Sequence, residues 1–281
     1  RKTFYVKQEA SKALIIDIIA YGCQWIALIY LSYMDLLSIA NTYAVLCISF
    51  AIASIYAFFQ HEKIYIEKTY FKAILLENWL YASYLLGTAL LQWLSGNFFI
   101  ITAGTLLGAS AVGAIRIAQN IMGILHVFFL ALENEVPVKA AWLYHKLGLK
   151  QLMHYIKKVS LLGGILTTAI LAIVAIYAEE ILLLLYGNEY IAYAPILIGY
   201  SFIYLFVFFG TTLRFAIRTV EKNKSIFIAY IISTLFSLCS AKYMINHFDV
   251  YGVLIGIAIT HVIMLSCYIF SLKKEFTALW K

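Results

Sequence analysis

The segment VSLLGGILTTAILAIVAIYA, residues 159–178, contains no charged residue and decides the fold class. A bilayer core about 30 Å thick is crossed by about 20 apolar residues of α-helix. Because a backbone in lipid must satisfy its own hydrogen bonds, only helices or closed barrels cross it, and a continuous apolar run favours the helix. The chain of 281 residues is 64% hydrophobic and 12% charged, with a mean hydropathy of +0.89. Soluble domains carry about 25% charged residues, so the sequence predicts a membrane protein.

Eight apolar segments of this kind predict an all-α, polytopic bundle of transmembrane helices. The predicted spans are 13–33, 40–59, 75–95, 112–132, 160–178, 194–213, 225–243 and 252–272. The run 98–107 is too short to cross a bilayer. It is either an extension of the third span or a tucked-in connector.

Basic residues are confined to alternate connections between the predicted spans. All but two of the 21 Lys and Arg residues lie in the segments 1–12, 60–74, 133–159, 214–224 and 273–281. The remaining two are Arg116 and Lys242. By the positive-inside rule the basic connections are cytoplasmic, which places both chain ends inside. The net charge of +7 therefore requires no nucleic acid as a partner.

The longest basic connection, 133–159, is predicted to be amphipathic and to rest on membrane lipids. Its apolar side chains are Trp142, Leu143, Leu147, Leu149, Leu152 and Ile156. Neighbouring lysines would then meet anionic lipid headgroups.

Three predicted spans carry polar side chains along one face, at 100° per residue. In the first span these are Asp17, Tyr21, Gln24 and Asp35; in the third, Glu77, Tyr81, Tyr84, Thr88, Gln92 and Ser95; in the fourth, Arg116, Gln119, Asn120, Gly123 and His126. Polar groups are costly in hydrocarbon, so these faces should meet the bundle interior or a water-filled cavity. Helix packing through polar side chains is the simpler alternative for each face.

Arg116 is the central residue of the predicted site. We expect it to bind a phosphate or a carboxylate of the substrate, because the guanidinium fork can donate two parallel hydrogen bonds. Snorkelling to the lipid headgroups is the open alternative. The other candidate substrate-binding residues are Asn120, Gln119, Gln92 and Tyr81. The candidate proton or cation sites for ion coupling are Glu77 and Asp17.

Catalytic and cofactor motifs are missing from the sequence. It contains no H-E-x-x-H metal motif, no G-x-S-x-G nucleophile motif and no phosphate-binding P-loop. Transport without a cofactor or metal therefore ranks above enzymatic activity. A membrane polysaccharide polymerase or acyltransferase stays open as an alternative, with His126 and His261 as its intramembrane candidates, and so does a structural scaffold.

Four local patterns resemble, in order and spacing, those of Wzx-type O-antigen and polysaccharide flippases in the MOP exporter superfamily. They are LLGASAVGAIRIAQNI (106–121), LALENEVPVKAA (130–141), EEILLLLYGNEYIAYAPIL (179–197) and VYGVLIGIAIT (250–260). The ordered set covers about residues 75–272. Two departures are Ala114-Ile115, where many members have an aromatic residue, and INHFDV (245–250), which lacks a proline often found there.

The resemblance implies the later part of a two-lobed transporter whose first spans lie upstream of Arg1. Residues 1–60 would end the first lobe, 61–74 would be a cytoplasmic linker, 75–272 the second lobe and 273–281 a cytoplasmic tail. Such proteins carry an undecaprenyl-diphosphate-linked oligosaccharide across the bacterial inner membrane by alternating access. Expected partners are this lipid-linked oligosaccharide, membrane lipids and the polysaccharide assembly machinery. A drug/cation antiporter of the same superfamily would share the fold, with a more acidic cavity.

Overall fold

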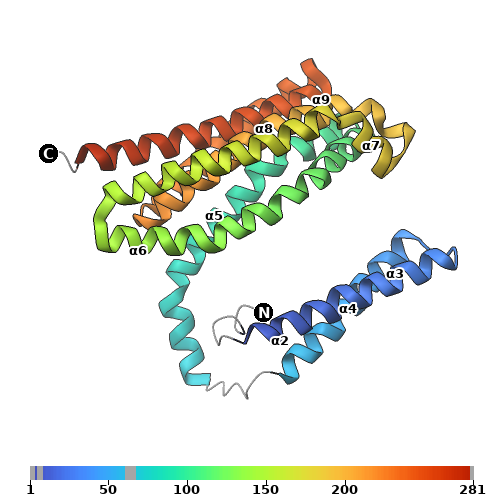
Figure 1. Cartoon of the computed structure of the whole chain (residues 1–281), viewed down its shortest axis with the longest axis horizontal. Helices are drawn as coiled ribbons and strands as arrows, with labels where there is room; N and C mark the ends of the chain where they lie inside the picture. Colours follow the sequence, from blue (N-terminus) through green and yellow to red (C-terminus); the bar gives the residue numbers. More distant parts are fainter. Residues whose placement is uncertain (1–3, 5–8, 61–67, 279–281) are drawn as a thin grey trace. The chain divides into compact units, whose positions relative to one another are not determined.

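The computed structural model describes Phe4 and residues 9–60 and 68–278. Inside these ranges the side chains of residues 10, 68–73, 80–81, 84–85 and 275–278 are not described. Every regular element of the described ranges is helical, which confirms the predicted all-α class (Figure 1). The chain divides into two compact units, residues 1–78 and 79–281.

The first unit contains the first two predicted spans. Its helices are α2 (Ala10–Asp17), the π-helical turn η1 (Ile18–Gly22), α3 (Cys23–Tyr33) and α4 (Ile39–Phe59). The π-turn lies inside the span predicted over 13–33 and leaves it continuous. It also changes the angle per residue, so the polar face calculated for a regular helix does not continue from Asp17 to Asp35. Ser38 caps the start of α4, and its hydroxyl accepts a hydrogen bond from the backbone N–H of Asn41 at 3.1 Å.

The second unit is built mainly from helices that pack around α8. Helix α5 (Lys68–Leu106) enters it from the first unit. The following elements are α6 (Ala109–Ile176), α7 (Ala178–Tyr186), the 3₁₀-helix η2 (Asn188–Tyr193), α8 (Ala194–Thr219) and α9 (Asn223–Ala278). Helix α8 packs against both α6 and α9.

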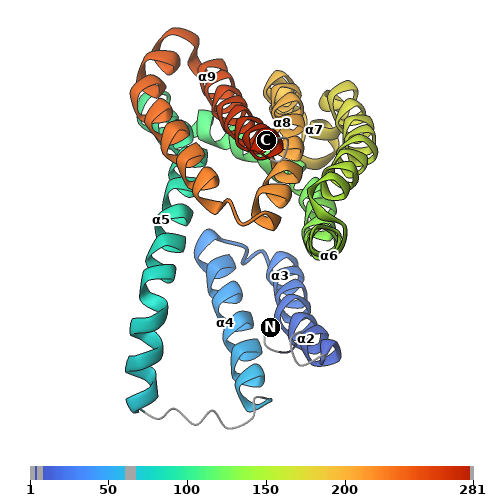
Figure 2. The ribbon, with the colours of Figure 1, turned by 90° about the vertical axis from the view of Figure 1, so that its left-hand side faces the viewer.

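Two of these helices are hairpins, which accounts for the predicted number of spans. Helix α6 reverses at Gly148, with φ 77°, and α9 reverses at Asp249, with φ 48°. Figures 1 and 2 show the two halves of each running back along each other. Six described helices are long and apolar enough to cross a membrane. Since two of them are hairpins, they contain the eight apolar segments that the sequence predicts.

Several helix ends lie beyond the predicted span edges. Helix α5 begins at Lys68, inside the predicted linker 61–74, of which residues 61–67 lie outside the described part. It continues to Leu106, so the run 98–107 is an extension of the third span. Helix α9 continues through most of the predicted tail 273–281, to Ala278. The polar ends contain no residue that stops a helix, so the backbone hydrogen bonds continue past the apolar core.

The predicted connector 133–159 forms the tip of the α6 hairpin, which corrects its expected placement. Leu149, Leu152 and Ile156 do not rest on the membrane surface, because they are buried in a core cluster with residues of α8 and α9. Trp142 and Leu147 are exposed, as a surface contact requires. One face of the hairpin packs into the core of the unit, so only part of its apolar side chains stays exposed.

A second core cluster fills the rest of the unit and fixes α5 against α9. Phe99 of α5 is fully buried, and its ring centre lies 6.2 Å from that of Phe236. Gly256, in the second half of α9, lets the Phe99 ring approach the backbone, because any Cβ there would collide with it. Thr234 of α9 also donates a hydrogen bond to the Leu91 carbonyl at 3.2 Å. Helix α5 is thereby held where its polar side chains reach α6 and α8.

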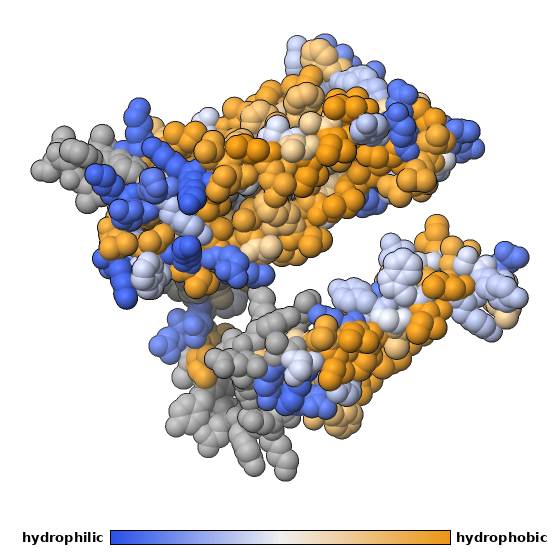
Figure 3. Space-filling view, viewed as in Figure 1, coloured by the Kyte–Doolittle hydropathy of each residue, from blue (hydrophilic) through white to orange (hydrophobic). Residues whose placement is uncertain are grey.

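The outside of the second unit is apolar over its middle. Large hydrophobic side chains such as Ile165, Ile173 and Phe202 are more than half exposed. Figure 3 shows hydrophobic residues across the middle of this unit and hydrophilic residues at its ends. This distribution matches a bundle whose sides contact lipid and whose ends contact water.

Candidate functional site

Arg116 lies near the start of α6 and joins three helices through hydrogen bonds. Helix α6 begins after Gly108, whose φ of 88° suits glycine. Arg116 donates from Nη1 to Oε1 of Gln119 at 2.7 Å and from Nη2 to Oδ1 of Asn97, on α5, at 3.4 Å. Gln119 in turn donates from Nε2 to the hydroxyl of Tyr200, on α8, at 3.1 Å. We call these four residues the Arg116 network.

The Arg116 network leaves the positive charge of the guanidinium uncompensated. Its partners Gln119 and Asn97 are neutral amides. In the part of the chain that the structure describes, no carboxylate forms an ion pair with Arg116. The side chain is exposed rather than sealed in the core. Arg116 therefore presents an accessible cation with free N–H donors.

Polar pairs continue from the Arg116 network along the contact between α6 and α8. The next pair is His126 Nε2 with the hydroxyl of Tyr204, at 3.1 Å. A further pair is Glu133 with Arg218, whose charged atoms are 3.8 Å apart. Residue numbers rise together in all the pairs, so the first half of α6 and α8 run parallel. The contact thus carries polar side chains over most of the length of α8.

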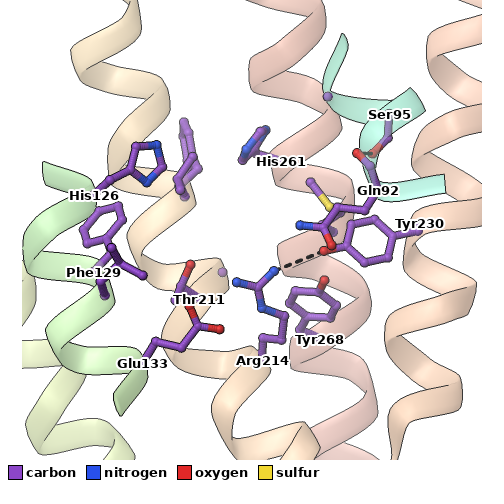
Figure 4. Close-up of a pocket in the computed structure, with 16 residues that line it drawn as sticks. Gln92, Ser95, His126, Phe129, Glu133, Thr211, Arg214, Tyr230, His261 and Tyr268 are labelled. Atoms are coloured by element: carbon purple, nitrogen blue, oxygen red, sulfur yellow. Dashed lines mark hydrogen bonds between the residues drawn. The ribbon is translucent and has the colours of Figure 1, made fainter. Parts of the chain in front are cut away.

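The second unit also contains a cavity of about 300 Å³ (Figure 4). Helices α5, α6, α8 and α9 all contribute to its wall. Its polar lining consists of Gln92, Ser95, His126, Glu133, Thr211, Arg214, Tyr230, His261 and Tyr268. This combination of one apolar wall and several convergent polar groups is typical of a ligand pocket.

Arg214 is the main charged group inside this cavity. Figure 4 shows its guanidinium between Glu133 and Tyr230. Nη1 donates to the hydroxyl of Tyr230 at 3.1 Å. Its Nε is buried and has no hydrogen-bond partner among the described residues. Above it, His261 donates from Nδ1 to the carbonyl of Ile257 at 3.0 Å, and its Nε2 forms no hydrogen bond with a described residue.

The sequence interpretation missed Arg214 because it placed this residue in the basic connection 214–224. Helix α8 continues to Thr219, so Arg214 lies inside the helix. A usable signal was present in the spacing: Arg214 follows Tyr200, Tyr204 and Thr211 at intervals of three, four or seven residues. These intervals place all four on one helix face.

The predicted site residues fall into separate places. Arg116 and Gln119 are bonded to each other, and Asn120 is exposed beside them. Gln92 instead lines the Arg214 cavity. Tyr81 is within α5, but its side chain lies outside the described part.

The two predicted ion-coupling carboxylates belong to the first unit. Asp17 is the last residue of α2, directly before the π-turn, and is partly buried. Glu77 is exposed on α5. Their role in ion coupling stays a prediction.

The histidines named for an enzymatic alternative have neutral partners. His126 pairs with the Tyr204 hydroxyl and His261 with a backbone carbonyl. Among the described residues, neither pairs with a carboxylate. The described part of the chain also contains no group of three or more His, Cys, Asp or Glu that could hold a metal ion.

Comparison with solved structures shows which proteins share this fold. One is an outward-facing multidrug resistance MATE family transporter of the MOP superfamily, with 15% identity, a TM-score of 0.64 and a match over 96% of this chain and 64% of that one. Another is a MOP superfamily transporter from Pyrococcus furiosus, with 17% identity, a TM-score of 0.64 and a match over 97% of this chain and 64% of that one. The chain thus spans a little under two thirds of the length of these structures.

Comparison by sequence identifies the family. None of the curated proteins compared with the chain matches it. The sequence model of the MatE family, however, matches residues 85–244, which are more than half of the chain and begin within α5 and end in the first half of α9. The chain belongs to the MatE family.

Proposed function

We propose that this chain is part of a transporter that moves an anionic, lipid-linked oligosaccharide across a membrane. One observation carries the proposal: Arg116 is accessible and is held by neutral amides, so its charge is available to a substrate. A guanidinium binds phosphate through parallel charge-assisted hydrogen bonds. The diphosphate that links lipid to oligosaccharide has this chemistry.

The family supports a transport mechanism of the alternating-access type. One solved structure with this fold is an outward-facing transporter. For another, reversed polarity of the binding pocket suggests a different function of that protein. In this chain, the two candidate sites each contain an arginine, Arg116 and Arg214. Basic sites favour an anionic substrate over a cationic drug.

The expected setting is the bacterial inner membrane, with the basic connections in the cytoplasm. The substrate would enter from the cytoplasmic leaflet, where the polysaccharide assembly machinery would deliver it. Without an ATP-binding motif, an ion gradient is the energy source that we propose, with Asp17 and Glu77 as the coupling carboxylates. Their neutral variants, Asp17→Asn and Glu77→Gln, should then make export independent of the ion gradient. Export that stays coupled in both variants would remove them from the mechanism.

The central test replaces Arg116 in the full-length protein that contains this chain. Export of the glycan is measured in a strain that lacks the native transporter, at equal protein levels in the membrane. Losing a hydrogen bond to a charged group costs about 1.5–3 kcal/mol, so Arg116→Ala should export at least about tenfold more slowly. Arg116→Lys keeps the charge but loses the two parallel donors of the guanidinium. Its export rate should lie between those of the wild type and Arg116→Ala.

Lys242→Ala is the matched control for Arg116→Ala. Lys242 is the other cation outside the basic connections and is also exposed. Its removal should leave export unchanged. Wild-type export by Arg116→Ala would overturn the proposal.

A drug/cation antiporter is the second candidate, because one structure with this fold is a multidrug resistance transporter. Under that function, the same cells should exclude a fluorescent organic cation and should lose this ability on Asp17→Asn or Glu77→Gln. Arg116→Ala should then leave efflux intact or improve it. This candidate is rejected if the cells export glycan but do not exclude the organic cation.

A further inference from the structure

The Arg214 cavity is lined by helices that are distant in sequence and converge on one guanidinium. Gln92 comes from α5, Glu133 from α6 and Tyr268 from α9. The volume of about 300 Å³ corresponds to roughly ten water molecules at about 30 Å³ each. It is thus large enough for a small polyatomic group.

Arg214 has more hydrogen-bond donors than the protein satisfies. A guanidinium carries five N–H groups and accepts no hydrogen bond. Only the bond from Nη1 to Tyr230 is formed among the described residues. Within the described part of the chain, the buried Nε has no hydrogen-bond partner. A buried donor without an acceptor is strongly unfavourable, so this geometry calls for an acceptor in the cavity.

The local charge balance favours an anionic acceptor. Glu133 also lines the cavity, but its carboxylate pairs with Arg218, at 3.8 Å. No carboxylate of the described residues forms an ion pair with Arg214. Two guanidinium groups and only one described carboxylate, that of Glu133, therefore lie at this end of the cavity. A net positive charge is left on the side that Arg214 faces.

Neutral side-chain donors from α8, α9 and α5 line the same cavity. Thr211 contributes a hydroxyl one turn before Arg214, and Tyr268 contributes another from α9. The amide of Gln92 enters from the α5 wall. A tetrahedral oxyanion accepts hydrogen bonds from several directions at once, which suits donors that converge from three helices.

We propose that this cavity is a binding site for a phosphate-type anionic group, with Arg214 as its anchor. One possible source of this group is the diphosphate of the transported lipid, and in that case the inference rests on the proposed function. The headgroup of an anionic phospholipid is the other source. The site lies at the end of the bundle that carries the basic connections, whereas the Arg116 network lies toward the opposite end of α6 and α8. A diphosphate would thus meet two separate cations along one helix contact.

The direct test uses purified full-length protein in neutral detergent. Radiolabelled inorganic pyrophosphate is added, and bound label is measured by equilibrium dialysis. We expect saturable binding that weakens at least about tenfold in Arg214→Gln and stays unchanged in Lys224→Gln. Lys224 is the matched control, because it is an exposed cation just beyond α8 that does not line the cavity.

A second pair of variants keeps the test valid if Arg214→Gln does not fold. Glu133→Gln alters a half-exposed side chain and removes the carboxylate next to Arg214. It should tighten pyrophosphate binding about fivefold through the lost repulsion. Glu135→Gln is its control, because Glu135 is an exposed carboxylate that does not line the cavity. Equal binding by wild type, Arg214→Gln and Glu133→Gln would overturn the site.

A lipid arm separates the two sources of the anion. The thermal stability of the protein is compared in nanodiscs of phosphatidylcholine with and without phosphatidic acid. The site is assigned to a lipid headgroup if phosphatidic acid stabilises the wild type but not Arg214→Gln, and if pyrophosphate does not bind. No response to either anion overturns the inference. Glycan export is measured separately, so that an anion site in a protein that exports no glycan would count against the proposed function alone.

Discussion

Replacing Gly256 by alanine should destabilise the second unit, although alanine is the better helix former. An added Cβ would lie 2.6 Å from Cδ1 of Phe99 and closer still to the far edge of the ring. Carbon atoms pack favourably at about 3.5–4.0 Å, so the ring must retreat by about 1 Å or more. Phe99 is fully buried and packs near Phe236, which leaves the ring no free space.

The magnitude follows from two opposing terms. Overpacking a close-packed core costs about 1–3 kcal/mol. Glycine to alanine inside a helix gains about 0.8–1 kcal/mol. Gly256→Ala should therefore lower the free energy of unfolding by about 1–2 kcal/mol. Gly123→Ala is the matched control: no atom of the described residues lies within 4 Å of its added Cβ, so it should raise stability by up to about 1 kcal/mol.

The assay is reversible unfolding of the purified full-length protein in mixed detergent micelles. Loss of helix by circular dichroism is followed against the fraction of sodium dodecyl sulfate. The two variants should shift the midpoint in opposite directions. A shift of Gly256→Ala to higher stability, alongside Gly123→Ala, would show that Phe99 is not packed against this backbone. The contact between α5 and α9 described above would then be wrong.

Three further predictions concern the α6 hairpin, the Arg116 network and the orientation of the chain. Gly148→Ala forces an L side chain to φ 77°, which should cost about 1–3 kcal/mol; the same unfolding assay measures it, and an unchanged midpoint would contradict the reversal there. Gln119→Leu removes the closest partner of Arg116, at 2.7 Å, and should lower stability by about 1–2 kcal/mol together with glycan export; wild-type values of both would argue against the network. A membrane-impermeant maleimide added to intact cells should label Leu184→Cys and leave Lys150→Cys unlabelled, and the reverse pattern would invert the predicted topology.

The sequence predicts the helices well because each transmembrane segment must be apolar over its own length. It also predicts that Arg116 and Gln119 share a helix face, because residues three apart are neighbours on any α-helix. It does not predict Asn97 and Tyr200 as partners of this pair. Those contacts depend on how α5 and α8 are rotated against α6, and rotation is set by core packing such as Phe99 against Gly256.

Helix ends are the least predictable feature, and the error at Arg214 follows from this. Hydropathy marks where the apolar core ends, whereas a helix ends where its backbone hydrogen bonds are broken. In α8 this happens beyond Thr219, before Glu221 with φ 59°. Arg214 lies between the end of the apolar segment and the end of the helix. The sequence interpretation therefore placed it in a connection, although it belongs to the helix bundle.

The α6 hairpin reaches well past the apolar core and therefore amplifies any movement of the second unit. Between residue 132, where the predicted span ends, and Leu147 the helix rises about 22 Å at 1.5 Å per residue. A rotation of the unit by about 10° would displace the tip by about 4 Å over that rise. The same rotation would move side chains near the middle of the unit far less. A pair of spectroscopic labels that includes the exposed Leu147 at the tip is thus a sensitive reporter of motion in this unit.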